Sequence, residues 1–521
     1  MSTLNQKGHV LAVNLQRLKQ QRREDDRVHS QAEKVNVVGA GGTLTAAYEQ
    51  LRNAAENTEE HLLVQNAIRR FYRQLFIARD ESLIQSSGSE LVVELTLAGY
   101  LPNDHLTREQ IGEMSRLATI YYRAYETIQA DRSLAPDRAT KWVLDVLAVN
   151  IEHVLSDHAQ EAAFVEFAYL QLDDMLDAKS TLGHETVDFG VLLFAAIHRA
   201  LLKSDTATIR ANLLSRYQVA IEDLNQYVAF NARLDSLIES PDADKLYHVV
   251  DRQGAPFRIL RRMIEETPDF EQKLEKRETF LDAYEKQIAN EYERVSTKLN
   301  RAIVRSIIFL IITKFIVGIA IEVPYDLWAY GEILWVPLLL NLLFPPIYMF
   351  ALRATHQLPG YANTQALVEK VDAMLYGDSK VSITRSRLKG RSYGTVFSVL
   401  YVLSGLTVVG GLMYLLLLLS FSLVHIAIFF VFLSAASFLG FRLSRLIREL
   451  EVGRSAQNGM TFIRDLLYLP FVVVGQWMSD KYSKVNIVTI ILDMLIELPL
   501  KTILRLVRQW GAFIDERKDR I

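Results

Sequence analysis

The chain has 521 residues, a formal net charge of −3 and no cysteine, which excludes disulfides and thiolate metal sites. The charge is divided unevenly, because residues 1–300 hold 35 Lys and Arg against 46 Asp and Glu, whereas residues 301–521 hold 23 against 15. The acidic N-terminal part argues against nucleic-acid binding, which needs a basic face to neutralise phosphates.

The N-terminal part of the chain is predicted to be soluble and helical. Residues 1–42 are mostly polar and predict a charged arm and linker without a secretory apolar segment, so we expect an unprocessed, cytoplasmic N-terminus. Residues 43–268 show helical periodicity interrupted by turns and predict an all-α domain. The apolar run Phe189–Ile197 is too short to cross a membrane and predicts a core helix.

The C-terminal part is predicted to cross a membrane. Residues 269–302 carry one apolar face at helical spacing and predict a long stalk helix that enters the first span. Runs of about 20 apolar residues match the ~30 Å hydrocarbon core of a bilayer. Four such runs predict a transmembrane domain over residues 303–441, with spans at Ile303–Ile321, Ile333–Leu352, Tyr393–Leu419 and Phe421–Phe441. The predicted fold class is all-α.

Basic residues flank these spans on one side, and the positive-inside rule then places both termini in the cytoplasm. Residues 442–521 predict amphipathic helices at the cytoplasmic interface, and a further hairpin that would give six spans is the alternative. Six cations are expected to contact anionic lipid headgroups: Arg442, Arg445, Arg448, Lys501, Arg505 and Arg508.

An ionisable residue lies inside the first predicted span. Lys314 is near its middle, where a charged side chain costs at least ~2.5–3.5 kcal/mol and usually faces the bundle interior. Asn341 in the second span and His425 in the fourth complete a candidate ion or solute pathway, and Pro345-Pro346 predicts an interruption of the second span. The alternative is a structural lysine that is hydrogen-bonded between helices.

An aspartate-rich segment lies in the soluble part. Asp173, Asp174 and Asp177 form a DDxxD pattern, and carboxylates at such positions of one helix can hold Mg²⁺. The segment loosely resembles the first aspartate-rich motif of helical prenyl-transferring enzymes, which would imply an isoprenoid-diphosphate substrate. No arginine pair and no second complete motif follow, so the sequence favours a solvated helix face.

Four further ionisable residues fall at helical spacings that could bring two of them to one metal: His153, Asp157, His158 and Glu161. The same pattern fits an ordinary polar helix surface, and we predict neither a metal nor another cofactor there.

For function, the sequence favours a membrane-anchored scaffold or regulatory protein without catalysis. Its acidic helical domain would bind a protein partner, its basic C-terminal helices would bind the anionic inner leaflet, and homo-oligomers are compatible with both. An ion channel or small-solute transporter that uses Lys314 is the alternative. A Mg²⁺-dependent isoprenoid-diphosphate enzyme is the third hypothesis.

Overall fold

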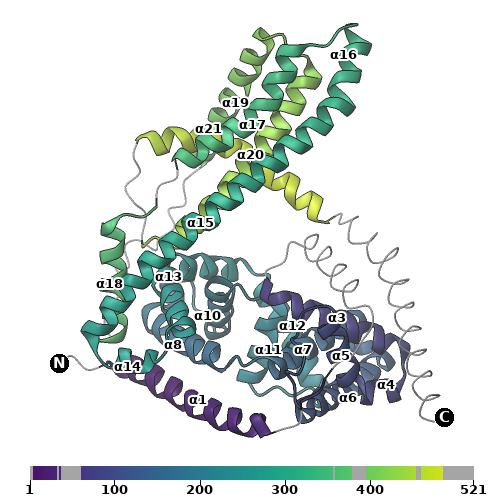
Figure 1. Ribbon diagram of the computed structural model, residues 1–521, viewed down its shortest axis with the longest axis vertical. Coiled ribbons are helices and arrows are strands. Elements are labelled where there is room, and N and C mark those ends of the chain that lie inside the picture. Colours follow the sequence, from purple (N-terminus) through teal and green to yellow (C-terminus); the bar gives the residue numbers. More distant parts are fainter. Residues whose placement is uncertain are drawn as a thin grey trace. The chain divides into compact units, whose positions relative to one another are not determined.

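The computed structural model describes residues 4–31, 34–36, 60–355, 358–377, 395–452 and 459–484. The regular elements in these ranges are helices (Figure 1), and one isolated antiparallel bridge joins Lys34 to Thr107. Contacts divide the described residues into an N-terminal unit, between residues 6 and 250, and a C-terminal unit, between residues 251 and 485 with residues 4 and 5. The all-α class is confirmed, whereas the predicted domain bounds and stalk role stay predictions.

The N-terminal unit is a bundle of short and medium helices. They are α1 (Gln6–Gln31), α3 (Glu60–Ala78), α4 (Glu81–Gln85), α5 (Ser87–Leu97), α6 (Arg108–Ala130), η1 (Arg132–Leu134), α7 (Pro136–Leu155), α8 (Ala159–Met175), α9 (Ala178–Leu182), α10 (Phe189–Ile197), the π-helical η2 (His198–Leu202), α11 (Thr206–Arg216) and α12 (Leu224–Ile238). The helix α13 (Pro241–Glu266) continues from this unit into the next. The predicted core helix α10 is buried from Leu192 to Ile197.

Local sequence explains where these helices start and how closely they pack. The Thr107 hydroxyl accepts a 3.3 Å hydrogen bond from the Gln110 N–H, and the Gln110 side chain accepts a 3.0 Å bond from the Thr107 N–H, so a capping box starts α6. Gly88 lets α5 approach α6, because a Cβ there would lie 2.3 Å from the Ile111 carbonyl oxygen. Fully buried side chains from α3, α5, α6 and α7 then form one core, among them Ile68, Leu91, Met114 and Leu147.

The C-terminal unit contains the long apolar helices. Its elements are α14 (Phe270–Leu274), α15 (Arg277–Val317), the π-helical η3 (Gly318–Glu322), α16 (Val323–Ala329), α17 (Trp335–Thr355), α18 (Tyr361–Leu375), α19 (Thr395–Leu418), α20 (Leu423–Arg448) and α21 (Gly459–Lys484). Within the described residues, four helices are long and apolar enough to cross a membrane: Arg277–Ala329, Trp335–Ala354, Val399–Leu418 and Leu423–Arg448. They lie at the four predicted spans and indicate an integral membrane protein, whereas part of the alternative with six spans falls outside the described ranges.

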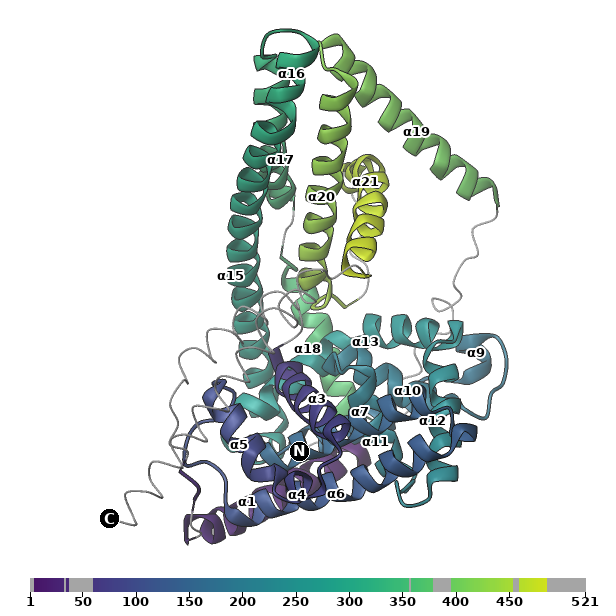
Figure 2. The ribbon, with the colours of Figure 1, turned by 90° about the vertical axis from the view of Figure 1, so that its right-hand side faces the viewer.

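The helix α20 is the centre of this bundle. It contacts α15, α17 and α21, and Figure 2 shows these four helices side by side. In the apolar window of α20 56 % of the residues are buried, against 6 % in that of α19. The exposed surface of α19 is itself apolar, as expected for a helix that faces lipid.

Outside the apolar segments, polar contacts join α18 to its neighbours. The Asn363 amide donates to the Leu450 carbonyl and to the Tyr292 hydroxyl, both at 2.8 Å. Arg277 forms two hydrogen bonds of 2.6 Å with Asp372. These contacts fix the start of α15 and the end of α20 around α18, so the bundle has a polar, hydrogen-bonded end.

The predicted interruption at Pro345-Pro346 is wrong, because α17 is helical from Trp335 to Thr355. Contacts with α20 support it on both sides of the prolines. The rings of Phe344 and Phe429 lie 4.7 Å apart, and the Tyr348 and Ser437 hydroxyls are 3.0 Å apart. Neighbouring helices of this kind allow a membrane helix to continue through proline.

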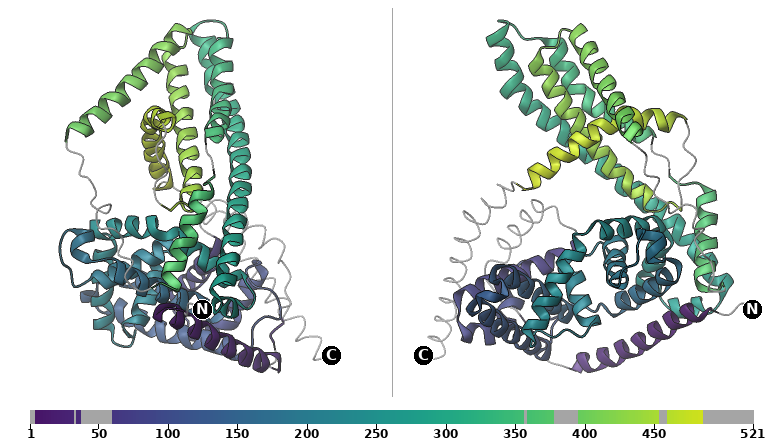
Figure 3. Two further views of the ribbon diagram at one scale, coloured as in Figure 1. Left: turned by 90° about the vertical axis from the view of Figure 1, so that its left-hand side faces the viewer. Right: turned by 180° about the vertical axis from the view of Figure 1, so that it is seen from behind.

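Among the described residues after the fourth span, Gly459–Lys484 forms the helix α21, with Pro470 inside it. In Figure 3 α21, drawn in yellow, crosses beside α20. Gly475 allows the close approach, because a Cβ there would lie 2.3 Å from the Ser434 carbonyl oxygen. Its predicted position at the interface stays a prediction, and residues 485–521 lie outside the described ranges.

Candidate functional site in the transmembrane bundle

The buried face of the first membrane-spanning helix changes from apolar to polar. From Leu299 to Leu310 its buried residues are apolar, and the next buried positions follow at intervals of four residues: Lys314, Gly318, Glu322 and Asp326. Side chains on the opposite face, such as Phe315 and Ile319, are apolar and exposed. The charged groups therefore lie inside the bundle while the lipid-facing surface stays apolar, which is where ionisable residues of membrane proteins are usually found.

A widened turn keeps these residues on one face. In η3 the Val323 N–H bonds to the Gly318 carbonyl, an i→i+5 contact. The following Pro324 has no N–H and would clash with an ordinary α-turn, which favours such a local rearrangement. A Cβ at Gly318 would lie 3.5 Å from Leu338 of α17, so glycine also leaves room for the neighbouring helix. Single π-turns inside α-helices are frequent at functional sites.

Lys314 forms a buried ion pair with Glu322. Lys314 is 2 % exposed and Glu322 0 %, and the lysine Nζ donates to the glutamate Oε1. The Asn341 Nδ2 of α17 donates to the same oxygen at 3.2 Å. The lysine Nζ also lies 4.9 Å from the ring centroid of Phe432 of α20, within cation–π range. The pair thus joins three helices.

Asp326 and His425 form the second half of the cluster. The Asp326 Oδ2 accepts a 3.0 Å hydrogen bond from the Leu334 N–H, and its Oδ1 lies 3.4 Å from the His425 Nε2 without hydrogen-bond alignment. The other imidazole nitrogen, Nδ1, lies 2.7 Å from the Ser422 hydroxyl. The Asn341 Nδ2 donates to the His425 carbonyl at 3.3 Å and so connects the two halves.

Several buried polar atoms of this cluster have no hydrogen-bond partner among the described residues. They are Glu322 Oε2, Asp326 Oδ1, Asn341 Oδ1 and His425 Nε2. Each such atom costs on the order of 1–3 kcal/mol of stability. Four of them in contacting side chains therefore oppose folding, and a binding role is a physical reason to retain them.

The formal charges of the cluster do not cancel when His425 is neutral. Lys314 balances one of the two carboxylates, Glu322 and Asp326, and one negative charge remains. An unbalanced charge in an apolar interior is expensive. One proton or one small monovalent cation would neutralise the cluster, and its carboxylate and amide oxygens are the ligand type that hard cations prefer.

Aromatic side chains mark one end of the cluster. Trp328, Tyr330 and Trp335 lie in and after α16 and are exposed, Trp328 at 84 %. Tryptophan and tyrosine are enriched at membrane–water interfaces. Asp326 lies in α16, two residues before Trp328, whereas Lys314 lies in α15, before η3.

The structure brings together three residues that the sequence selected separately, Lys314, Asn341 and His425. It adds Glu322 and Asp326, which follow the predicted end of the first span at Ile321, because the helix continues through η3 and α16. The four-residue spacing from Lys314 was the available signal. Pro345 is buried and Pro346 is partly buried within α17, one turn along the helix from Asn341.

The aspartate-rich segment does not have the predicted single-helix geometry. Asp173 and Asp174 are exposed at the end of α8, which stops at Met175. Asp177 instead caps α9, since its carboxylate accepts a 3.0 Å hydrogen bond from the Ser180 N–H. Asp174 forms an ion pair with Lys7 of α1. Asp174 and Asp177 thus serve as an ion-pair partner and a helix cap, and Asp173 is exposed.

The cations expected at headgroups can be placed in part. Arg442, Arg445 and Arg448 are exposed on the last turns of α20, and the Arg448 guanidinium lies 4.8 Å from the Phe441 ring centroid. Lys501, Arg505 and Arg508 lie outside the described residues.

Comparisons of the chain with protein-family models, with curated proteins and with solved structures find no match.

Proposed function

We propose that this integral membrane protein takes up a proton or a small monovalent cation at the Lys314 cluster, and that it functions as an ion-conducting or ion-coupled transport protein. The proposal rests on one buried carboxylate in excess of Lys314 when His425 is neutral, combined with polar atoms of Glu322, Asp326, Asn341 and His425 that have no hydrogen-bond partner among the described residues. A purely structural ion pair would need neither.

The proposed uptake begins at the aromatic end of the cluster. Asp326 and His425 are closest to this end and would receive the ion first. An ion bound there would reduce the excess negative charge near Lys314 and so weaken the attraction between Lys314 and the carboxylates. The pair of Lys314 with Glu322 connects α15 to α17, because Asn341 donates to the same glutamate oxygen. Ion binding would in this way change the contacts between the helices, which is what coupling requires.

The orientation of the protein belongs to the same proposal. With basic residues flanking the spans, both termini and the N-terminal unit would lie in the cytoplasm, and Arg442, Arg445 and Arg448 would contact an anionic inner leaflet. The cluster would then open toward the opposite side. The scaffold hypothesis from the sequence, with a protein partner for the acidic part, stays the alternative.

Flux in proteoliposomes tests the proposal. The wild type is compared, at matched incorporation, with the double variant Lys314→Met and Glu322→Gln, which removes both charges but leaves an amide for Asn341. We expect proton or monovalent-cation flux in the wild type and at least a tenfold loss in the double variant. Replacing both partners of a buried pair is often nearly neutral for stability, so the loss would not reflect unfolding.

A control variant removes another buried polar pair from the same bundle. Tyr348→Phe with Ser437→Ala breaks the 3.0 Å hydroxyl contact between α17 and α20 without changing charge. Its flux should equal that of the wild type. Absence of flux from folded wild-type protein for protons, Na⁺ and K⁺ would reject the transport proposal and leave the scaffold hypothesis ahead.

A further inference from the structure

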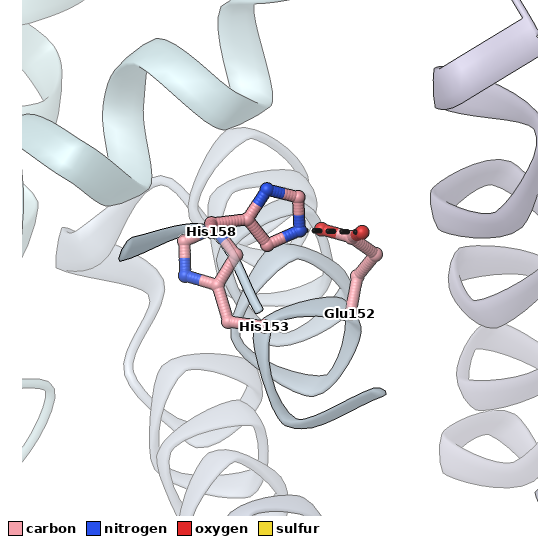
Figure 4. A group of neighbouring side chains, drawn as sticks. All are labelled: Glu152, His153 and His158. Carbon is pink, nitrogen blue, oxygen red and sulfur yellow. Dashed lines mark hydrogen bonds and ion pairs between the residues drawn. The ribbon is translucent and has the colours of Figure 1, made fainter. Parts of the chain in front are cut away.

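A second group of ionisable side chains lies in the N-terminal unit, where α7 ends and α8 begins. Glu152 and His153 are in the last turn of α7, and His158 directly precedes α8. One ligand atom from each of the three side chains lies within 4.8 Å of the other two. Figure 4 shows the imidazole rings next to each other and the Glu152 carboxylate beside His158.

The carboxylate of this group is buried and only partly used. The His158 Nε2 lies 2.8 Å from Glu152 Oε1, and the ring centroids of His153 and His158 are 4.8 Å apart. The Glu152 side chain is 8 % exposed, and its second oxygen, Oε2, has no hydrogen-bond partner in the described part of the chain. The local fold does not require a buried carboxylate oxygen without a hydrogen-bond partner next to two imidazoles.

The neighbouring acid that the sequence would pair with these histidines is engaged elsewhere. The Asp157 Oδ1 accepts a 2.9 Å hydrogen bond from the Ala159 N–H at the start of α8. Its Oδ2 lies 2.7 Å from a guanidinium nitrogen of Arg22. Asp157 thus holds the loop that connects α7 and α8, and this loop brings His158 back to Glu152.

We propose that Glu152, His153 and His158 form a binding site for a divalent transition metal, with Zn²⁺ as the best match. Zn²⁺ binds imidazole nitrogen and carboxylate oxygen at about 2.0–2.2 Å, which puts ligand atoms of a tetrahedral site about 3.4 Å apart. The distances between the ligand atoms, from 2.8 Å for Glu152 and His158 up to 4.8 Å within the group, lie on both sides of this value. The exposed His153 side chain can rotate to reach the ion. Mg²⁺ and Ca²⁺ would fit poorly, because they prefer oxygen ligands.

The site would keep one coordination position for water or a substrate. Three protein ligands are present, and a tetrahedral ion takes four. His153 is exposed and His158 is 34 % exposed, so the open position faces solvent. A bound metal ion would connect the end of α7 to the start of α8 more tightly than the hydrogen bond between Glu152 and His158 does.

Calorimetric titration of the chelator-treated full-length protein with Zn²⁺ in detergent tests the site. We expect one saturable equivalent in the wild type and at least a tenfold weaker affinity in His153→Ala and in Glu152→Gln. His184→Ala is the matched control, because His184 Nε2 lies 3.1 Å from Asp242 Oδ2 in a histidine–carboxylate pair of the same unit. This control should bind Zn²⁺ as the wild type does.

Two results would overturn the proposal. One is the absence of saturable Zn²⁺ binding to folded wild type, and the other is unchanged affinity in folded His153→Ala. Because His153 is exposed, its replacement should not disturb folding even if Glu152→Gln does, and circular dichroism of each variant checks this. Visible absorption of bound Co²⁺ that disappears in His153→Ala would independently support direct ligation.

Discussion

The two units of the molecule bury charge in different ways. In the N-terminal unit, Arg210 is 3 % exposed, donates to the Asn231 Oδ1 at 2.7 Å and pairs with Asp235. Asp235 uses its other oxygen to accept a 3.0 Å hydrogen bond from the Trp142 indole. Asp235 is half-buried and also lies 3.6 Å from the Arg138 guanidinium, so no negative charge is in excess. The acceptor oxygens of Asn231 and Asp235 are all engaged, although Arg210 Nε has no hydrogen-bond partner within the described ranges.

The cluster in the C-terminal unit is of comparable size but is not closed. Its two carboxylates, Glu322 and Asp326, face one lysine and His425, which is charged only when protonated. Each carboxylate retains an oxygen without a hydrogen-bond partner among the described residues. A balanced network of buried charges holds helices in place. In a network with excess negative charge, the carboxylates can also bind an incoming ion. This difference in charge balance distinguishes the structural Arg210 network from the candidate site at Lys314.

The largest expected loss of stability comes from removing the carboxylate of the Arg210 network. Asp235→Ala leaves the buried Arg210 without its counter-charge and the Trp142 indole without its acceptor. Breaking such a pair on one side destabilises proteins by about 3–5 kcal/mol. Thermal unfolding of the full-length protein in detergent, followed by tryptophan fluorescence, should show a clearly lower midpoint than the wild type.

An exposed pair in the same unit supplies the control. Arg116 and Glu113 of α6 form a surface ion pair at 2.6 Å. Surface pairs contribute little to stability, so Glu113→Gln should leave the midpoint nearly unchanged. Equal midpoints for Asp235→Ala and Glu113→Gln would contradict the structural role assigned to the Arg210 network.

Much of the fold could be predicted from the sequence because long apolar runs and helical periodicity are local signals. The site could be predicted only in part. Lys314 stood out as a charge in an apolar run, whereas Glu322 and Asp326 looked like the polar end of that run. Their inclusion depends on the π-turn at Gly318–Glu322, through which the helix continues beyond the predicted end of the span at Ile321.

The histidine group shows a similar limit. Glu152 and His153 are adjacent in sequence, and adjacent residues of a helix do not face each other. The spacing rules therefore selected Asp157 and Glu161 as companions of the histidines. The structure shows different partners, because the loop after α7 turns Asp157 toward Arg22 and places His158 next to Glu152.

A smaller loss of stability is expected where two helices pack closely against a glycine, once in each unit. Gly88 and Gly475 each sit where a Cβ would lie 2.3 Å from a carbonyl oxygen of the neighbouring helix. Gly88→Ala and Gly475→Ala should each destabilise their unit by about 1–3 kcal/mol, as overpacking does. Hydrogen exchange measured by mass spectrometry should increase in α5 and α6 for the first variant and in α20 and α21 for the second.

Two other helical glycines are the matched controls. A Cβ at Gly112 of α6 or Gly410 of α19 would meet nothing within 4 Å. Alanine at these positions should be neutral or slightly stabilising, because it favours the helix. Faster exchange in Gly112→Ala than in Gly88→Ala would contradict the close approach of α5 and α6.

The smallest expected effect concerns a single proton in the histidine group. The hydrogen bond to Glu152 raises the pKa of His158, so the pair contributes stability that is complete below the ordinary histidine pKa. This contribution is lost as the pH rises through the raised pKa of the folded protein. In chelator-treated protein, Glu152→Gln should therefore lower the pKa of His158, as measured by NMR of the imidazole protons. An unchanged pKa would mean that Glu152 and His158 do not pair in solution, and the geometry proposed for the metal would lose its basis while the Lys314 cluster would be unaffected.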